Sequence, residues 1–237
     1  MTPLVLVHLY PAEMNIYGDT GNVIALRRRA EWRGIDLRVE SVGMGESYEY
    51  ASADIVFSGG GQDRSQVDVA ADLQRTSGAI HEAVAAGTVF LTVCGAYQLF
   101  GRRFVTHDGT EMPGIGVFGA ETIAGDVRMI GNIVVESPWG RLVGFENHSG
   151  RTLLDEGQEP LGRVAKGFGN NEDRETEGAV AANAFGTYLH GSLLPKNPAL
   201  ADELLARALR RRGHDGTLEP LDDTLEEKAA AVAARRP

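Results

Sequence analysis

The amino-acid sequence predicts an α/β fold with a mostly parallel central sheet flanked by helices, and with additional antiparallel strands in the second half. Short apolar runs alternate with stretches of helical spacing as far as Gly101, a pattern typical of parallel strands joined by right-handed crossovers. After Gly101 glycines are frequent and apolar stretches are short, which favours smaller, antiparallel strands packed on that core. The length of 237 residues suits one large domain that buries roughly 70% of its unfolded surface.

The first half contains candidate strands and helices in alternation. The dense apolar run that opens the chain is typical of a strand buried on both faces. The second helix has Ala, Leu and Ile at helical spacing and stops at Gly87. The expected strands are Leu4–Leu9, Ile35–Val42, Ala53–Phe57 and Thr88–Val93, and the expected helices are Val23–Trp32 and Val67–Ala86.

The second half is expected to add short strands and one clear helix. The helix Pro198–Arg212 has an apolar face of four leucines. Residues 1–213 are expected to form one domain, and residues 214–237 a C-terminal tail that is either a frayed helix over Leu225–Arg236 or disordered. The expected strands are Gly114–Phe118, Ile130–Glu136, Leu142–Phe145, Ala179–Ala182 and Thr187–Leu189.

Composition excludes several classes of protein. The net charge of -10 and the pI of about 5.1 argue against nucleic-acid binding, which needs clustered positive charge. A single cysteine, Cys94, excludes internal disulfides and Cys-rich zinc sites. The N-terminus lacks a basic segment before its short apolar run, and no stretch reaches the apolar length of a membrane span. We therefore expect a cytoplasmic protein without a membrane span.

Cys94 is the strongest candidate for a catalytic residue. The expected strand Thr88–Val93 leads directly into Cys94-Gly95 and a helical segment, which predicts a sharp strand-to-helix turn. Such a turn lifts a nucleophile clear of the sheet. It also places the sulfur at a helix N-terminus, where the thiolate is stabilised. The alternative is a buried structural cysteine, which is common in proteins.

His190 is the candidate base for this thiol. It follows a short apolar segment and precedes Gly191, so that it is expected at the carboxyl end of a sheet strand, where open α/β sheets place their sites. A histidine packed at a strand end is the alternative. His148 is the most serious competitor, and the remaining histidines are His8, His81, His107 and His214.

A glycine loop, Ser58–Asp63, follows the third expected strand. Consecutive glycines let backbone N–H groups approach a ligand atom closely. Together with the N–H of Gly95, this loop is suited to stabilise a tetrahedral oxyanion. An ordinary strand-to-helix turn is the alternative, and phosphate binding is the weaker one because no Gly-Lys-Ser/Thr follows.

These motifs together resemble the class I glutamine amidotransferases. The resemblance rests on Val93–Gln98, the Gly59-Gly60 pair and Tyr188–Gly191, which occur in one order. The variant that they resemble is that of cobyric acid synthase and its relatives, in which a Cys-His pair works without the His-x-Glu carboxylate. Ser192 stands where that Glu would be.

Further segments resemble the amidotransferase subunits of lipid II isoglutaminyl synthases. The resemblance covers most of the chain up to about His190 and is thin beyond it. The segments that carry it are Leu9–Pro11, Asn15–Asn22, Leu26–Arg29 and Gly144–Thr152.

The resemblance implies a class I amidotransferase fold and a role for each matched catalytic position. Cys94 would form a γ-glutamyl thioester, and His190 would take its proton and return one to the departing ammonia. Gly60 and Gly95 would supply the oxyanion donors.

Arg128 and Gln98 are the implied glutamine-binding side chains. A guanidinium can grip the α-carboxylate of glutamine with two hydrogen bonds, although most arginines are solvated surface residues. Gln98 would contact the same ligand or merely open the helix. Thr92 departs from the wider family, in which a Gly often precedes the turn.

Two carboxylates near these motifs have structural interpretations. Asp19 precedes a helix and is most simply an N-cap, with an orienting role as the less favoured reading. Glu146 could be the carboxylate that orients the catalytic histidine as the third member of a triad. We expect instead that Glu146 and His148 have a structural role.

The resemblance further implies a glutaminase subunit without a cofactor of its own. It would supply ammonia to a Mur-ligase-like, ATP- and Mg-dependent partner in a heterodimer, and that partner would amidate the D-glutamate α-carboxyl of lipid II. No nucleotide-binding loop surrounds the three lysines, which are Lys166, Lys196 and Lys228. One alternative is an amidotransferase for another acceptor such as cobyrinic acid, but a fused synthase would need an extra domain that 237 residues cannot hold. The other alternative is a non-catalytic binding subunit with the same fold.

Overall fold

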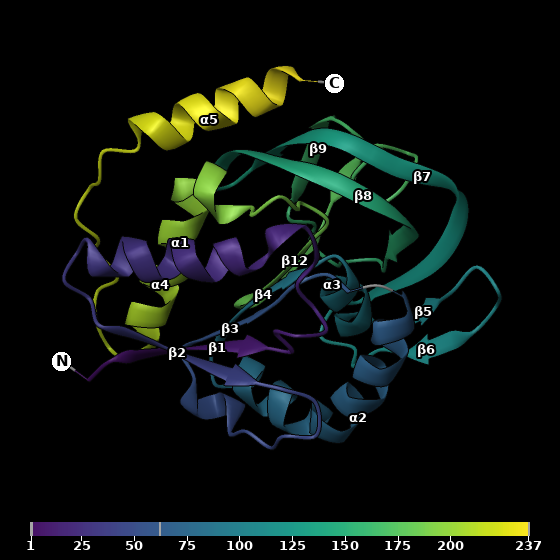
Figure 1. The fold of residues 1–237 in the computed structure, drawn as a ribbon, viewed down its shortest axis with the longest axis horizontal. Coiled ribbons are helices and arrows are strands. Elements are labelled where there is room, and N and C mark those ends of the chain that lie inside the picture. Colours follow the sequence, from purple (N-terminus) through teal and green to yellow (C-terminus); the bar gives the residue numbers. More distant parts are fainter. Residues whose placement is uncertain (1, 62, 237) are drawn as a thin grey trace.

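A computed structural model describes residues 2–61 and 63–236 and contains a central sheet and a second, mostly antiparallel sheet (Figure 1). The strand order of the central sheet is β11-β12-β4-β3-β1-β2, parallel except for β11. This arrangement confirms the predicted α/β fold with a mostly parallel sheet. The strands are β1 (Leu4–Leu9), β2 (Leu37–Val42), β3 (Ile55–Ser58), β4 (Val89–Val93), β11 (Ala179–Ala181) and β12 (Ala184–Thr187).

Helices cover both faces of the central sheet, which explains why every position of β3, β4 and β12 is buried. Figure 1 shows α1 and α4 on one side and α2 on the other. The strand order reverses direction between β1 and β3, and ligands bind in open α/β sheets at the carboxyl ends of strands beside such a point. The helices are α1 (Thr20–Glu31), α2 (Asp63–Ala85), α3 (Gly95–Phe100) and α4 (Pro198–Arg211).

The second sheet is built on a long hairpin of β7 and β8, which spans 18 and 15 residues. The hairpin has an irregularity in its register between Ala124 and Met129. The sheet has the order β10-β9-β7-β5-β6, with β8 paired to β7. Its strands are β5 (Arg103–Val105), β6 (Glu111–Pro113), β7 (Ala120–Ser137), β8 (Gly140–Leu154), β9 (Gly162–Lys166) and β10 (Thr176–Glu177).

The expected short strands of the second half are partly wrong. Ile130–Glu136 and Leu142–Phe145 are only the most apolar parts of the hairpin, because cross-strand hydrogen bonds extend both strands through polar residues. Gly114–Phe118 is not a strand: its N–H groups bond the carbonyls that end α3, such as that of Leu99. Of the expected strand Thr187–Leu189, only Thr187 belongs to the sheet, as the last residue of β12; the chain then leaves the sheet, since the N–H of Tyr188 donates to the Glu177 carboxyl.

The C-terminal segment is fastened by a buried arginine. The Arg29 guanidinium on α1 bonds Asp202 of α4 and Asp223 of the segment, each at 2.6 Å. A last helix, α5 (Thr224–Arg235), follows with no buried residue and contacts β7, β8 and the short helix η3 (Leu194–Lys196). It lies along the edge of the molecule in Figure 1. The division into a domain of residues 1–213 and a tail of residues 214–237 stays a prediction, and Met1, Gln62 and Pro237 lie outside the described residues.

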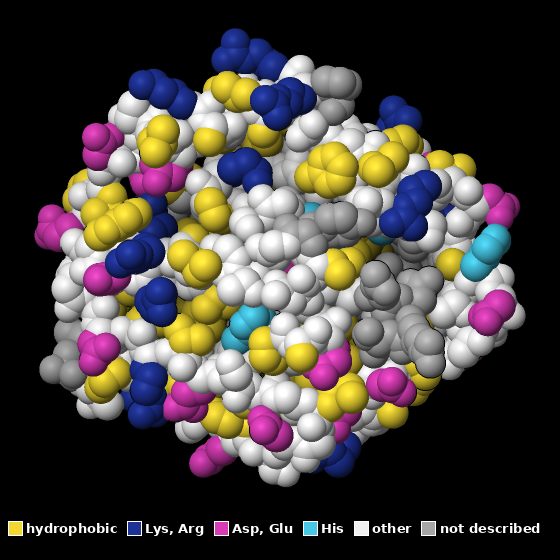
Figure 2. All heavy atoms as spheres, viewed as in Figure 1, with side chains coloured by type: hydrophobic (Ala, Val, Ile, Leu, Met, Phe, Trp, Pro, Cys, Tyr) yellow, Lys and Arg dark blue, Asp and Glu magenta, His cyan; other side chains and the backbone are white. Residues whose placement is uncertain are grey.

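The surface mixes charges on the face that Figure 2 shows, where basic, acidic and apolar side chains lie among one another. Large apolar side chains are exposed on the outside of the β7–β8 hairpin. They are Ile123, Val127, Ile130 and Leu153. Among the described helices, none combines the length and the apolar character that crossing a membrane requires.

Candidate active site

The chain turns sharply at Cys94 as it passes from β4 into α3. Cys94 has φ 52° and ψ -107°, a backbone conformation that residues with a side chain rarely adopt and that proteins retain at functional sites. The N–H of Cys94 donates to Thr187 of β12 at 2.8 Å. The Thr92 hydroxyl donates to the carbonyl of Phe185, so that threonine fits where the wider family often has glycine. The expected nucleophile turn is therefore present.

His190 lies beside Cys94, just beyond the end of β12. Its N–H donates to the carbonyl of Phe145 on β8 at 2.7 Å, and the N–H of Phe145 donates back at 3.2 Å. Its ring lies near enough to the Cys94 sulfur for the two groups to interact by charge. A Cβ added at Gly60 would lie 2.8 Å from the ring and 3.3 Å from Cys94 Cβ. Gly60 thus allows the glycine loop, the base and the nucleophile to meet.

Asp19 is the third member of this cluster, and its predicted role as an N-cap is wrong. Its side chain makes no capping hydrogen bond to α1. Instead, the fully buried carboxylate lies 3.4 Å from His190 Nδ1 through one oxygen and accepts the N–H of Gly60 at 2.8 Å through the other. The sequence alone does not reveal this role, because an aspartate that precedes a helix looks the same whether it caps the helix or contacts a distant histidine.

The charges of the cluster support one another. Burial by itself lowers the pKa of His190, but its interactions with Cys94 and with the Asp19 carboxylate outweigh burial and raise that pKa to about 10. The imidazole therefore carries its proton at neutral pH. A thiolate beside an imidazolium is the state of a cysteine that is ready to attack a carbonyl.

Two backbone donors lie next to the sulfur. The predicted oxyanion donor Gly60 gives its N–H to Asp19 in this conformation, so its role stays a prediction. Among the described residues, the N–H groups of Gly61 and Gly95 have no hydrogen-bond partner. A Cβ added at Gly95 would lie 3.1 Å from Gly61 N, so these two donors are close enough to serve one oxyanion.

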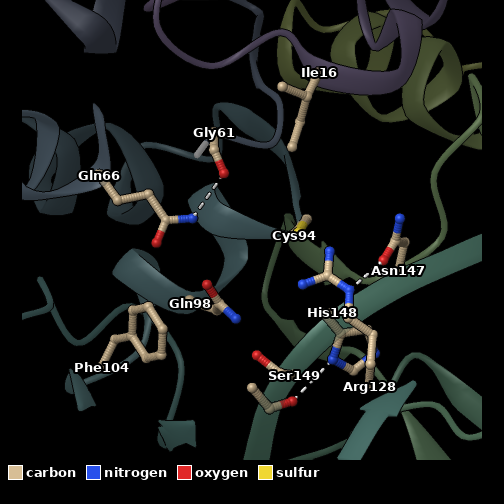
Figure 3. Close-up of a pocket in the computed structure, with 11 residues that line it drawn as sticks. Ile16, Gly61, Gln66, Cys94, Gln98, Phe104, Arg128, Asn147, His148 and Ser149 are labelled. Carbon is tan, nitrogen blue, oxygen red and sulfur yellow. Dashed lines mark hydrogen bonds between the residues drawn. The ribbon is translucent and has the colours of Figure 1, made fainter. Parts of the chain in front are cut away.

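A cavity of about 460 Å³ opens at Cys94 (Figure 3), a volume typical of small-molecule sites, which span roughly 300–1,000 Å³. Arg128 lies across the cavity from Gln66 and Gln98, and its Nε donates to Asn147 at 2.7 Å. The lining residues are Ile16, Gly61, Gln66, Cys94, Gln98, Phe104, Arg128, Asn147, His148, Ser149 and Gly150. The structure thus brings the predicted Arg128 and Gln98 to the nucleophile.

The orientation of Gln98 is fixed by hydrogen bonds. Its Nε2 donates to the Tyr188 hydroxyl at 3.1 Å, and that hydroxyl also bonds Thr152 at 2.6 Å. The amide is therefore held at the wall of the cavity, as its predicted contact with the ligand requires.

Comparison with known proteins decides the family of this site. A model of the CobB/CobQ-like glutamine amidotransferase domain matches residues 5–198. The chain belongs to this family. It is 40% identical over 237 residues to the lipid II isoglutaminyl synthase (glutamine-hydrolyzing) subunit GatD of Staphylococcus aureus, with 100% of this chain and 97% of that protein covered. These matches confirm the resemblance that the motifs gave.

Two further relatives match more distantly. The cobyric acid synthase of Pelotomaculum thermopropionicum is 36% identical over 159 residues, which are 60% of this chain and 30% of that protein. A solved glutamine amidotransferase of Thermotoga maritima superposes with a TM-score of 0.55 at 17% identity, covering 98% of this chain and 94% of that one. The likeness to the solved structure confirms the amidotransferase fold.

His148 lines the amidotransferase cavity but is not suited to be the base. Its ring stacks on Tyr188 with 3.6 Å between ring centroids, and its Nδ1 bonds the carbonyl of Gly150. Burial lowers the pKa of His148 to about 3, so that it stays neutral. The other competitors, His8, His81, His107 and His214, are not among the residues that line the cavity in the described part of the chain.

Glu146 has a structural role, as expected. Its two oxygens accept the N–H groups of Phe168 and Gly169 at 2.8 and 2.9 Å, which ties β8 to the loop after β9. The carboxylate that faces His190 comes from Asp19 instead.

Proposed function

We propose that this chain is the glutamine-hydrolysing subunit of a lipid II isoglutaminyl synthase. The observation that carries the proposal is the buried Cys94–His190–Asp19 cluster at the end of a cavity that also holds Arg128. The full-length similarity to the Staphylococcus aureus subunit supports the choice of lipid II among the acceptors that amidotransferases serve.

The first half of the reaction forms a thioester. Arg128 holds the α-carboxylate of glutamine, and the Cys94 thiolate attacks the side-chain amide carbon. The carbonyl oxygen becomes an oxyanion within reach of backbone N–H groups. The C–N bond then breaks while the His190 imidazolium gives its proton to the leaving nitrogen, which departs as ammonia.

The second half restores the enzyme. A water molecule adds to the γ-glutamyl thioester while the now neutral His190 takes a proton from it. The C–S bond breaks, glutamate leaves, and Cys94 and His190 return to thiolate and imidazolium. Asp19, which contacts His190 Nδ1, keeps the ring oriented and stabilises its charge in both halves.

Ammonia must then meet an activated carboxylate on another protein. Amide formation requires activation of that carboxylate, and this sequence contains no Gly-x-x-x-x-Gly-Lys-Ser/Thr loop. We assign activation to a Mur-ligase-like subunit that binds ATP and Mg and amidates the D-glutamate α-carboxyl of lipid II in the cytoplasm. The two subunits form a heterodimer in this proposal, which shields ammonia from water.

The alternative acceptor, cobyrinic acid, has weaker support. The similarity to cobyric acid synthase covers 60% of this chain, against 100% for the lipid II subunit. A non-catalytic role is a separate alternative. It is tested by diazo-oxo-norleucine, a glutamine-like electrophile, which labels Cys94 selectively in an active glutaminase and leaves it unmodified in a binding subunit.

The experiment that tests the function is reconstitution with the ligase, ATP and lipid II. We expect amidated lipid II from glutamine only when both proteins are present. With the Cys94→Ala variant, added ammonium salt should still support amidation while glutamine should not. Amidation of lipid II by this chain without a second protein, or from glutamine with the variant, would refute the proposal.

A further inference from the structure

Gln66 is a buried side chain at the cavity to which the reaction above gives no role. It is 2% exposed, stands in the first turns of α2 and lines the cavity beside Cys94. Figure 3 shows its amide directed toward Gly61, on the side of the cavity opposite Arg128. Its Nε2 donates to the carbonyl of Gly61 at 3.2 Å.

The same amide also lies against the start of α3. A Cβ added at Gly95 would lie 2.2 Å from Gln66 Nε2, closer than any side chain tolerates. Gly95 therefore leaves the space that the amide occupies. Gln66 thus contacts both glycines whose N–H groups have no partner among the described residues. It donates to the carbonyl of Gly61 and packs against Gly95.

The amide comes at a cost to the fold. Gln66 Oε1 is buried and has no hydrogen-bond partner among the described residues, and an unsatisfied buried polar atom lowers stability by about 1–3 kcal/mol. A methionine would fill the same volume without that cost. Stability alone therefore does not explain why this position has an amide. The feature that a methionine would lack is the hydrogen bond to Gly61, and a buried polar atom without a partner indicates a functional role for the side chain.

We propose that Gln66 is a positioning residue that sets the distance between the Gly61 and Gly95 N–H groups and so shapes the oxyanion site. The proposal rests on the proposed glutaminase function. Both halves of the reaction pass through an oxyanion, so the hydrogen bond to Gly61 acts on the transition states of each. It acts little on bound glutamine, whose carbonyl oxygen carries only partial charge.

The test compares two reactions of the same thiolate. Glutamine hydrolysis forms an oxyanion, whereas alkylation by iodoacetamide displaces iodide from a saturated carbon and forms none. We expect Gln66→Met to lower kcat for glutamine about 10- to 100-fold, somewhat less than the loss of an oxyanion donor itself. KM and the rate of Cys94 alkylation should stay close to those of the wild type.

Gln74 on the same helix provides the matched control. It also donates to backbone carbonyls, those of Pro113 and Gly114 at 3.1 and 2.9 Å, but at the surface. Gln74→Met should leave kcat unchanged. All variants are assayed as full chains with the ligase present.

Two results would overturn the proposal. One is an unchanged kcat in Gln66→Met. The other is an equal loss of hydrolysis and of alkylation, which would mean that Gln66 only supports the fold or the thiolate. A wild-type chain that hydrolyses no glutamine with its ligase present would refute the proposed function itself, and this proposal with it.

Discussion

Asp19 is the residue whose role depends most on the three-dimensional structure. Its two oxygens face two donors, His190 Nδ1 at 3.4 Å and Gly60 N at 2.8 Å. Asparagine has one acceptor oxygen and no charge, so it can serve only one of them. Asp19→Asn should therefore lower kcat/KM about 100-fold, the scale of general acid–base help.

The pH profile gives this substitution a specific signature. A carboxylate raises the pKa of a neighbouring imidazole, so its removal lowers the pKa of His190, and activity should fall at a lower pH on the alkaline side. The exposed Asp68→Asn is the matched control. An alkaline limb at the wild-type position would mean that Asp19 does not act on His190.

Arg128 is expected to act through binding of glutamine. Hydrogen bonds to charged groups contribute about 1.5–3 kcal/mol, which corresponds to a roughly 10- to 100-fold rise in KM for Arg128→Ala. Alkylation of Cys94 by iodoacetamide should change little. Arg151→Ala, which removes another exposed arginine of the hairpin, should leave KM unchanged. If steady-state kinetics gave an unaltered KM for Arg128→Ala, Arg128 would be a solvated surface residue that does not bind glutamine.

At this scale the sequence was sufficient for some residues and insufficient for others. Cys94 and His190 were predicted from motifs, and Arg128 and Gln98 from the family resemblance. The structure places Cys94, Arg128 and Gln98 at one cavity and His190 beside Cys94. Asp19 and Gln66 were not predicted, because their roles arise from partners 171 residues away in the first case and from a loop carbonyl in the second. Neither partner leaves a periodic or motif-like signal along the chain.

Among the elements, β12 and α3 pack closely through Gly186. A Cβ added there would lie 2.2 Å from Tyr97 Cδ2 and 2.8 Å from Phe118. Since α3 begins after Cys94 and β12 leads to His190, this contact helps to set the distance between nucleophile and base.

Gly186→Ala should therefore reduce both stability and activity. Overpacking of a core typically costs about 1–3 kcal/mol, which denaturant unfolding would measure beside glutaminase activity. Gly78→Ala is the matched control: nothing lies within 4 Å of its added Cβ in α2, and it should raise stability by roughly 0.5–1 kcal/mol. Equal unfolding curves for Gly186→Ala and the wild type would contradict the close packing.

The elements of the parallel core were predictable because each follows its own local pattern. β1 was predicted with its observed bounds, and α4 differs by one residue at its end. The β7–β8 hairpin was predicted only as fragments, since pairing between strands extends it through polar residues such as Glu121 and Arg151, where the apolar pattern fails. Cross-strand pairing is a non-local interaction that a local pattern does not encode.

In the molecule as a whole, Glu177 joins the second sheet to the central one. It ends β10, and its Oε1 accepts the N–H of Tyr188 at 2.6 Å and the Thr187 hydroxyl at 3.0 Å. Burial raises the pKa of Glu177 to about 8. The native state thus holds a proton that the unfolded chain releases near its ordinary pKa of 4.5.

This raised pKa predicts how stability depends on pH. Between the two pKa values the native state binds more protons than the unfolded one, so the contribution of Glu177 is full below the lower value and is lost as pH rises through the higher one. Glu177→Gln keeps the acceptor and removes the titration. Between the two pKa values, the free energy of unfolding of Glu177→Gln should therefore rise relative to that of the wild type by up to about 1.4 kcal/mol for each pH unit.

Urea unfolding at several pH values would measure this difference. The control is Glu175→Gln, an exposed carboxylate two residues earlier, which should run parallel to the wild type. If the free energy of unfolding of Glu177→Gln also changed with pH as that of the wild type does, the pKa of Glu177 would not be raised in the native state.

The central claim is that Cys94 hydrolyses glutamine through a covalent thioester. Ammonia and glutamate released from glutamine, measured with the ligase present for the wild type and for Cys94→Ala, test this claim most directly. We predict equal amounts of both products from the wild type, and no detectable release from Cys94→Ala with an unchanged thermal unfolding midpoint. Release by Cys94→Ala at close to the wild-type rate would contradict the covalent mechanism.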